Sequence, residues 1–243
     1  MELIILAAGK SKRIFNSIKK NKCLIEINKK SLIEKIIMDS KNYFKKINVI
    51  TGFKSHLIKK KIKNYSKINI IHNKDYYKTE MLHSIIVGLK KINKDVVISY
   101  SDILISKKIW KTFSKLKKDE IMIPINTDWK KIWNLRGTSI YEDAESLSIN
   151  KNNYLNEIGS KIHKNIIVDG QFMGLIFIPK NLIKKIIHLY NKNKLKKMQT
   201  TQFLNLLLSK KFKIKCKKTN LFWYEIDDIS DLKNLNKIKN KID

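Results

Sequence analysis

A chain of 243 residues, 43% of them hydrophobic, can bury a substantial core, which excludes a disordered protein. Its 52 Lys and Arg against 21 Asp and Glu give a formal net charge of +31, a value that by itself suggests a nucleic-acid or anionic-membrane partner. However, Arg13 and Arg136 are the only arginines, and lysines are spread along the chain instead of gathered in one segment, which argues against a dedicated nucleic-acid module. We favour compositional drift, such as an AT-rich genome produces, with an anionic partner as the alternative.

The two cysteines, Cys23 and Cys216, lie far apart and show no CxxC spacing. This pattern excludes a disulfide framework or a cysteine zinc cluster and is typical of a reducing compartment. The first residues lead directly into a short apolar run without a charged leader, and no apolar run approaches the ~18 residues of a membrane span. We therefore expect a cytoplasmic protein without a transmembrane segment.

The first half of the chain alternates predicted strands and helices. Strands are expected at residues 3–6, 47–52, 68–71 and 95–100, a short strand or turn at 23–27, and helices from 31, over 56–62 and over 81–89. Ser31 and Glu34 have the spacing of an N-terminal capping box. Because strand–helix alternation places successive strands in parallel, we predict an α/β fold with helices on both faces of the sheet.

From residue 121 the predicted elements become shorter. A further strand is expected at 121–125, and the segments at 138–141, 146–149, 154–158 and 171–178 indicate an antiparallel insertion. Helices at 182–190 and 200–208, a strand at 213–216, a strand-like segment at 222–226 and a last helix from 230 complete the chain. No repeat, low-complexity block or linker interrupts it, so we predict a single domain.

Small residues and cations follow the first predicted strand. Ala7, Ala8 and Gly9 leave the backbone open to a ligand, and peptide N–H groups bind anions well. Positive charge around the same point comes from Lys10, Lys12, Arg13 and Lys22. This combination predicts a pocket for a nucleotide triphosphate.

Acidic residues follow two other predicted strands. Asp102 comes directly after the strand at 95–100, where a carboxylate either faces the ligand crevice and holds Mg²⁺ or caps a turn. Glu225 and Asp227 alternate along the segment at 222–226 and beyond, which places them on one face. If that edge lies beside Asp102, the carboxylates could share one metal. The alternative is that Asp228 or Ser230 only caps the last helix.

These motifs, in their order along the chain, resemble those of GT-A-like nucleotidyltransferases, which join a nucleotide to a small phosphorylated compound. The family pattern is an apolar strand followed by L-A-A-G-x-[GS]-x-R, then P-K-x-L, an aspartate after the fourth strand and a late acidic pair. Here these are residues 6–13, residues 21–24, Asp102, and Glu225 with Asp227. Asn21 replaces the proline, a departure that weakens the turn but keeps Lys22.

The resemblance implies a single-domain, three-layer α/β/α Rossmann-like fold with a mixed, mainly parallel central sheet and a small antiparallel insertion. It also implies one domain over residues 1–243, with a nucleotide-binding half at about 1–120 and an acceptor-binding half at about 121–243. A homodimer is one candidate assembly.

Later segments look most like the cytidylyltransferases that act on phosphocholine or 2-aminoethylphosphonate. The resemblance is carried by residues 128–129, 133, 136, 143–147, 157–159, 170–175 and 223–227. It implies acceptor binding by Trp129, Trp133, Arg136, Asp143, Glu145, Gln171 and Tyr224. The aromatic residues could box a quaternary ammonium group, or Asp143 or Glu145 could pair with a primary one, while ordinary packing is the alternative for the tryptophans.

The implied reaction is transfer of CMP from CTP to a small phosphonate or phosphate-ester acceptor, with Mg²⁺ as cofactor and pyrophosphate as product. The catalytic residues would be Lys22, Arg13 and Asp102, and the metal ligands Asp102, Asp227 and Glu225. The nucleotide-binding residues would be Leu6, Ala7, Ala8, Gly9, Ser11, Arg13, Lys22, Met81, Ser84 and Asp102. The alternatives are a sugar-1-phosphate nucleotidyltransferase and a non-catalytic basic protein that binds nucleic acid or anionic membranes.

Overall fold

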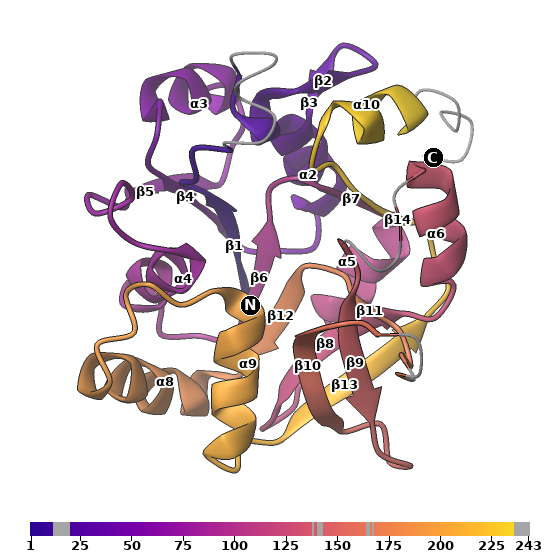
Figure 1. Ribbon diagram of the computed structural model, residues 1–243. Helices are drawn as coiled ribbons and strands as arrows, with labels where there is room; N and C mark the ends of the chain where they lie inside the picture. Colours follow the sequence, from indigo (N-terminus) through magenta and orange to yellow (C-terminus); the bar gives the residue numbers. More distant parts are fainter. Residues whose placement is uncertain (12–19, 138, 140–142, 164–165, 167, 236–243) are drawn as a thin grey trace.

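The computed structural model describes residues 1–11, 20–137, 139, 143–163, 166 and 168–235. Arg13 and most of the strand expected at 138–141 lie outside these residues. Figure 1 shows a central sheet with helices on either side of it.

The central sheet of the described chain has eight strands, in which parallel pairing dominates. Its order is β11 (Gln171–Phe172), β8 (Ile121–Asn126), β12 (Leu175–Ile178), β6 (Val96–Tyr100), β1 (Glu2–Ala7), β4 (Ile47–Thr51) and β5 (Ile68–His72), with β13 (Ile214–Thr219) paired to β8. The strands β6, β1, β4 and β5 are mutually parallel, whereas β12 runs antiparallel to both of its neighbours. The mixed, mainly parallel sheet predicted from the sequence is confirmed.

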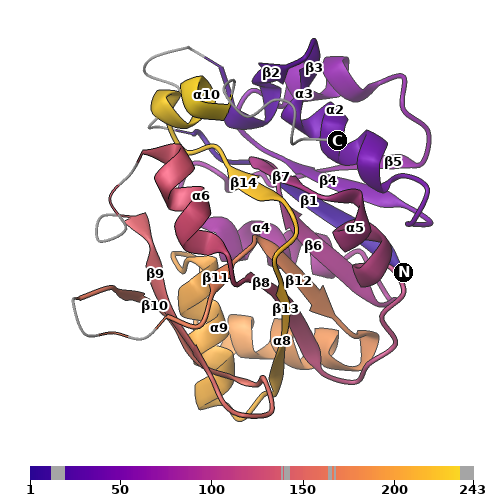
Figure 2. The same cartoon turned by 90° about the vertical axis from the view of Figure 1, so that its right-hand side faces the viewer.

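Strand β1 is buried on both faces because helices cover the sheet from both sides (Figure 2). Alternate residues of a strand point to opposite faces, so Leu3 and Ile5 enter one core and Ile4 and Leu6 enter the other. The first core includes residues of α2 (Leu32–Ser40), α3 (Ser55–Ile62) and α5 (Lys107–Phe113). The second includes residues of α4 (Met81–Leu89), α8 (Lys180–Lys192) and α9 (Thr200–Ser209). This arrangement is the three-layer architecture expected from strand–helix alternation.

The predicted capping box at the start of α2 is present. The backbone N–H of Ser31 donates to Glu34 Oε2 at 2.9 Å, and the Ser31 hydroxyl donates to the same oxygen at 2.7 Å. Such a cap contributes about 1 kcal/mol to helix stability. It fixes α2 directly after the short hairpin of β2 (Glu26–Ile27) and β3 (Lys30–Ser31).

The antiparallel insertion is smaller than the sequence pattern indicated. Among the described residues of the expected insertion, β9 (Glu145–Ile149) and β10 (Leu155–Lys161) form a separate hairpin, which packs on α9. Residues 171–178, expected as part of this insertion, instead form β11 and β12 of the central sheet. Gly174 separates the two strands because its φ of +73° is incompatible with an extended chain.

A short strand and a helix that were not predicted from the sequence pack against the last segments of the described chain. Residues Ile103–Ile105 form β7, which pairs antiparallel with β14 (Trp223–Glu225) in a two-stranded ribbon outside the central sheet (Figure 1). Helix α6 (Trp129–Arg136) packs on α10 (Ile229–Leu235), the predicted last helix. The β7–β14 ribbon contains residues from both sides of residue 120. The division into a nucleotide-binding half and an acceptor-binding half stays a prediction.

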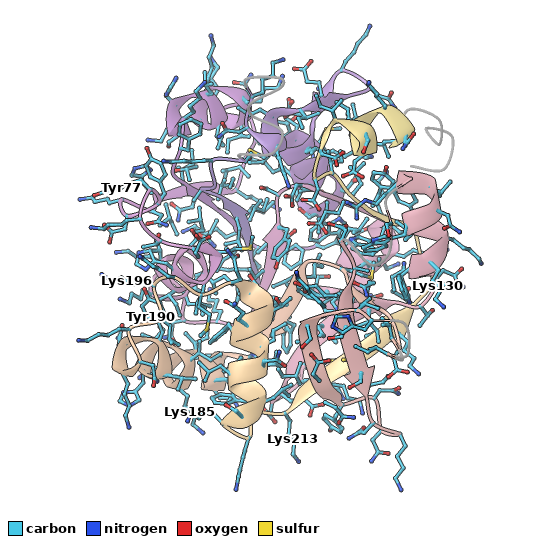
Figure 3. All side chains as sticks on the ribbon, viewed as in Figure 1. Tyr77, Lys130, Lys185, Tyr190, Lys196 and Lys213 are labelled. Atoms are coloured by element: carbon cyan, nitrogen blue, oxygen red, sulfur yellow. The ribbon has the colours of Figure 1, made fainter. Side chains whose placement is uncertain are left out.

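Lysine side chains point outward from unrelated parts of the fold, as the labelled residues in Figure 3 show. Lys130 belongs to α6, Lys185 to α8, Lys196 to the segment between α8 and α9, and Lys213 precedes β13, and all four are exposed. The origin of the net charge stays a prediction. Within the described residues, no helix combines the length and the apolar character that a membrane crossing needs.

Candidate active site

A cavity of about 540 Å³ opens at the carboxyl ends of β1 and β6, the edge at which ligands bind in open α/β sheets. The loop after β1, the first turns of α4 and residues 100–102 line it. All the predicted nucleotide-binding residues among those described lie on its wall: Leu6, Ala7, Ala8, Gly9, Ser11, Lys22, Met81, Ser84 and Asp102. Arg13 lies outside the described residues.

The loop after β1 is tied to the segment that carries Lys22. The Ser11 hydroxyl accepts a hydrogen bond from the backbone N–H of Lys22 at 3.1 Å, and Lys22–Leu24 form one turn of 3₁₀ helix. Asn21 replaces the family's proline and has a φ of −65°, the value that a proline ring would impose. Its side-chain amide donates to the carbonyl of Phe53 at 2.9 Å, which holds the turn that the proline would otherwise stiffen.

Asn73 lines the cavity opposite the β1 loop, and the sequence analysis missed it. It is buried, follows β5, and donates to the Ser84 hydroxyl at 3.0 Å, while its own oxygen accepts the N–H of Asp75 at 2.9 Å. The Asn73–Ser84 pair presents a fixed polar surface at the start of α4, in the wall of the predicted nucleotide pocket. A polar residue at the carboxyl end of a parallel strand was the signal that could have identified it.

Gly52 allows the close approach that shapes this pocket. A Cβ at position 52 would lie 2.7 Å from the carbonyl oxygen of Ala8 and 2.6 Å from Cβ of Tyr76, so Gly52→Ala should destabilise the fold by about 1–3 kcal/mol. Gly9→Ala is the matched control, because no atom lies within 4 Å of the added Cβ, and its effect should stay within about 0.5 kcal/mol. Urea unfolding measures both, and equal effects would contradict the packing argument.

Three carboxylates meet beside the cavity. Asp102 lies between β6 and β7, Glu225 ends β14, and Asp227 follows two residues later. The ribbon brings them together, because Glu225 pairs with Ile103 and the N–H of Ile226 donates to the carbonyl of Asp102 at 3.0 Å. One oxygen of each carboxylate lies within 4.8 Å of the others. We call Asp102, Glu225 and Asp227 the carboxylate triad.

The ammonium group of Lys22 lies among these carboxylates. Its Nζ is 3.3 Å from Asp102 Oδ2 and donates a second hydrogen bond to Asp227 Oδ1. Burial alone would lower the pKa of Lys22, but the charges of Asp102 and Asp227 raise it, so the amine stays protonated. Three carboxylates therefore surround one ammonium group, and the cluster keeps an excess of negative charge.

Burial and this excess of negative charge both affect the pKa values of the triad carboxylates. Burial raises the pKa of Glu225 well above its ordinary value, and repulsion from Asp227 and Asp102 adds to the effect. Burial also raises the pKa of Asp102, against the opposing charge of Lys22. Oxygen ligands and unbalanced negative charge are what a hard divalent cation such as Mg²⁺ requires, so the donor set fits this metal.

Arg136 contacts other protein residues instead of facing the cavity as predicted for acceptor binding. Its side chain is 2% exposed. Its Nε donates to Asp231 Oδ1 at 2.8 Å, its Nη1 donates to Asp143 Oδ2 at 2.8 Å, and its Nη2 is 3.4 Å from Asp227 Oδ2. Asp231 also accepts the backbone N–H of Asp227 at 2.7 Å. Arg136 and Asp231 thus hold Asp227 through both its side chain and its backbone.

The expected aromatic box is not formed in the structure. Trp129 and Trp133 are each 3% exposed and stack edge to face in the core of one sheet face, with ring centroids 5.7 Å apart. Tyr224 is fully buried and its hydroxyl donates to the carbonyl of Asp231 at 2.9 Å. An apolar core stabilises these rings by burial, so they serve the packing of α6 and β14.

The remaining predicted acceptor residues lie on or beside the β9 hairpin. Asp143 pairs with Arg136, and the Gln171 side chain joins β11 to β9 by hydrogen bonds to the N–H and carbonyl of Glu145. Burial raises the pKa of Glu145. Its carboxylate accepts a hydrogen bond from the Thr201 hydroxyl at 3.5 Å, and Glu145 is not among the residues that line the cavity.

Residues 3–202 match the family described as MobA-like NTP transferase domain. A CTP:phosphoglutamine cytidylyltransferase from Campylobacter jejuni is 30% identical over 250 residues, which cover 96% of this chain and 98% of that protein.

Two solved structures share the fold. The inositol-1-phosphate CTP transferase of T. maritima has a TM-score of 0.77 at 18% identity, covering 100% of this chain and 97% of its own. The CTP:phosphocholine cytidylyltransferase of Streptococcus pneumoniae has a TM-score of 0.73 at 19% identity, covering 98% of each chain. The chain belongs to the MobA-like NTP transferase domain family, and it is a nucleotidyltransferase.

Proposed function

We propose that this chain is a cytidylyltransferase that transfers CMP from CTP to a small phosphorylated acceptor and releases pyrophosphate. The observation that carries the proposal is the position of the carboxylate triad and Lys22 at the edge of a cavity lined by the open backbone of residues 7–9. The 30% identity to a CTP-dependent relative over nearly the whole chain supports CTP as the nucleotide.

The backbone N–H groups of the β1 loop would bind the phosphates of CTP, and Asn73 with Ser84 would face the base. The triad residues Asp102, Glu225 and Asp227 would hold Mg²⁺, which when bound neutralises charge on the phosphate oxygens. We also propose that Arg13 steadies the leaving pyrophosphate.

An acceptor phosphate or phosphonate oxygen is anionic at neutral pH and needs no general base. It attacks the α-phosphorus in line, a new P–O bond forms, and the bond to the bridging oxygen of pyrophosphate breaks. Lys22 neutralises charge at the reacting centre, so the chain contributes positioning and electrostatic stabilisation. Cys23 takes no part as a nucleophile, because burial raises the pKa of its thiol to about 12.

The proposed acceptor carries a primary ammonium group, as 2-aminoethylphosphonate and phosphorylated amino acids do. Burial of Trp129, Trp133 and Tyr224 takes these rings out of reach of a quaternary ammonium, whereas Tyr76, Tyr77 and Tyr100 line the cavity, so the acceptor panel decides between the two ammonium types. The carboxylate proposed to pair with a primary ammonium is Glu145 of β9, a candidate that the resemblance implies.

A pyrophosphate-release assay tests the function. Purified protein with Mg²⁺ should release pyrophosphate from CTP faster than from ATP, GTP or UTP, and only when an acceptor is present. The acceptor panel comprises 2-aminoethylphosphonate, phosphoglutamine, phosphocholine, inositol 1-phosphate and sugar 1-phosphates. Activity with sugar 1-phosphates alone would favour the alternative nucleotidyltransferase. No release with any combination, combined with DNA or anionic-lipid binding that weakens steeply with salt, would favour a basic binding protein.

A further inference from the structure

Lys22 places an ammonium group where the carboxylate triad would hold a metal. Its Nζ lies 3.3 Å from Asp102 Oδ2 and is hydrogen-bonded to Asp227 Oδ1, and both carboxylates offer an oxygen to the candidate metal site. The side chains of Lys22, Asp102 and Asp227 are 11%, 19% and 11% exposed, so little water screens these charges. Arg136 already lies 3.4 Å from the other oxygen of Asp227, so a divalent cation at the triad would add a third positive centre. It would repel the Lys22 ammonium over a few ångströms in a poorly screened site.

The backbone of Lys22 is held beside the loop that follows β1, whereas its ammonium group lies at the triad. Its N–H donates to the Ser11 hydroxyl at 3.1 Å, and the residue begins the 3₁₀ turn next to the loop where the phosphates are expected. A lysine carries its charge on a flexible four-carbon stem. From one fixed backbone position, the ammonium group therefore has two anionic targets, the triad and the phosphates of a nucleotide in the cavity.

We propose that Lys22 is the resident cation of the triad in the nucleotide-free protein, and that a divalent cation displaces its ammonium group towards the nucleotide phosphates. The inference rests on the proposed function in that the triad is taken as the metal site. Metal binding would then release the lysine that the nucleotide requires, and nucleotide binding would hold that lysine away from the metal ligands. Each ligand thus raises the affinity for the other, because both favour the same position of Lys22.

The test measures metal binding without nucleotide. Isothermal titration of nucleotide-free protein with MnCl₂ should give a dissociation constant for Lys22→Gln at least about tenfold lower than for wild type, since the competing ammonium is gone. Lys10→Gln is the matched control, because Lys10 is an exposed cation on the same cavity wall, and its dissociation constant should stay within about threefold of wild type. The Lys22→Gln variant should also bind CTP more weakly than the wild-type protein does.

A second measurement uses the wild-type protein and does not depend on the folding of a variant. In ¹⁵N-lysine spectra, a hydrogen-bonded, slowly exchanging ammonium signal should be present without metal and absent in Lys22→Gln, and diamagnetic MgCl₂ should abolish it. An unchanged signal at saturating Mg²⁺ would overturn the inference, as would equal metal affinities of Lys22→Gln and wild type. No metal binding by any variant would overturn it too, whereas the pyrophosphate assay with wild type decides the proposed function separately.

Discussion

Replacement of Asp102 by asparagine is expected to lower turnover by about 10²-fold or more, the typical effect of losing a key electrostatic group. Asparagine keeps the shape of the side chain but removes one charge of the carboxylate triad and replaces one of the two oxygens near the Lys22 ammonium with an NH₂ group. Steady-state pyrophosphate release at saturating CTP measures the effect. A folded variant that keeps more than about a third of wild-type turnover would contradict the role given to Asp102.

Stability should respond differently from turnover in this variant. The pKa of Asp102 is raised by burial, so its ionised form at neutral pH disfavours the folded state, and a neutral asparagine removes that penalty. We therefore expect the free energy of unfolding of Asp102→Asn to be no lower than that of wild type. Asp119→Asn is the matched control, because Asp119 is exposed and outside the site, and it should change neither quantity.

Replacement of Arg136 by methionine is expected to destabilise the fold by about 3–5 kcal/mol, because it leaves buried carboxylates without their cation. Asp231 is fully buried and receives two hydrogen bonds from the guanidinium, at 2.8 and 3.1 Å. The change should also lower turnover, since Asp227 loses the group near its Oδ2. Urea unfolding and pyrophosphate release measure the two effects.

The control for this variant is Lys130→Met on the same helix. Lys130 is exposed, with its Nζ 5.7 Å from the ring centroid of Trp129, so its loss should stay within about 0.5 kcal/mol. Adding Asp231→Asn to Arg136→Met should recover part of the lost stability, because the uncompensated charge is removed. If Arg136→Met is as stable as Lys130→Met, the buried ion-pair network does not hold α6 and α10 together.

The parts of the fold that the sequence predicted depend on local patterns. The apolar strand before Ala7, the capping box at Ser31 and the period of the Met81–Leu89 helix are read within a few residues, and the structure contains all three. The cavity wall after β1 follows from the same local motif.

The parts that the sequence did not predict depend on long-range contacts. Strand β7 has only three residues and is defined by its pairing with β14, more than 100 positions later. Arg136 was assigned to the acceptor because its buried partner Asp231 lies 95 positions away and nothing local indicates the pair. The tryptophans of α6 could equally bind a cation or fill a core, and only tertiary packing decides between the two.

The position of β14 has a consequence for the order in which a growing polypeptide acquires its parts. The strands β1, β4, β5 and β6 and the wall of the cavity come from the first 102 residues, apart from Gln199, whereas Asp227 meets Lys22 across 205 positions. During synthesis, the cavity wall with Lys22 and Asp102 can therefore assemble long before Glu225 and Asp227 leave the ribosome. Until then the nascent chain would lack two of the three proposed metal ligands, so we predict that it gains activity only when the β7–β14 ribbon has formed.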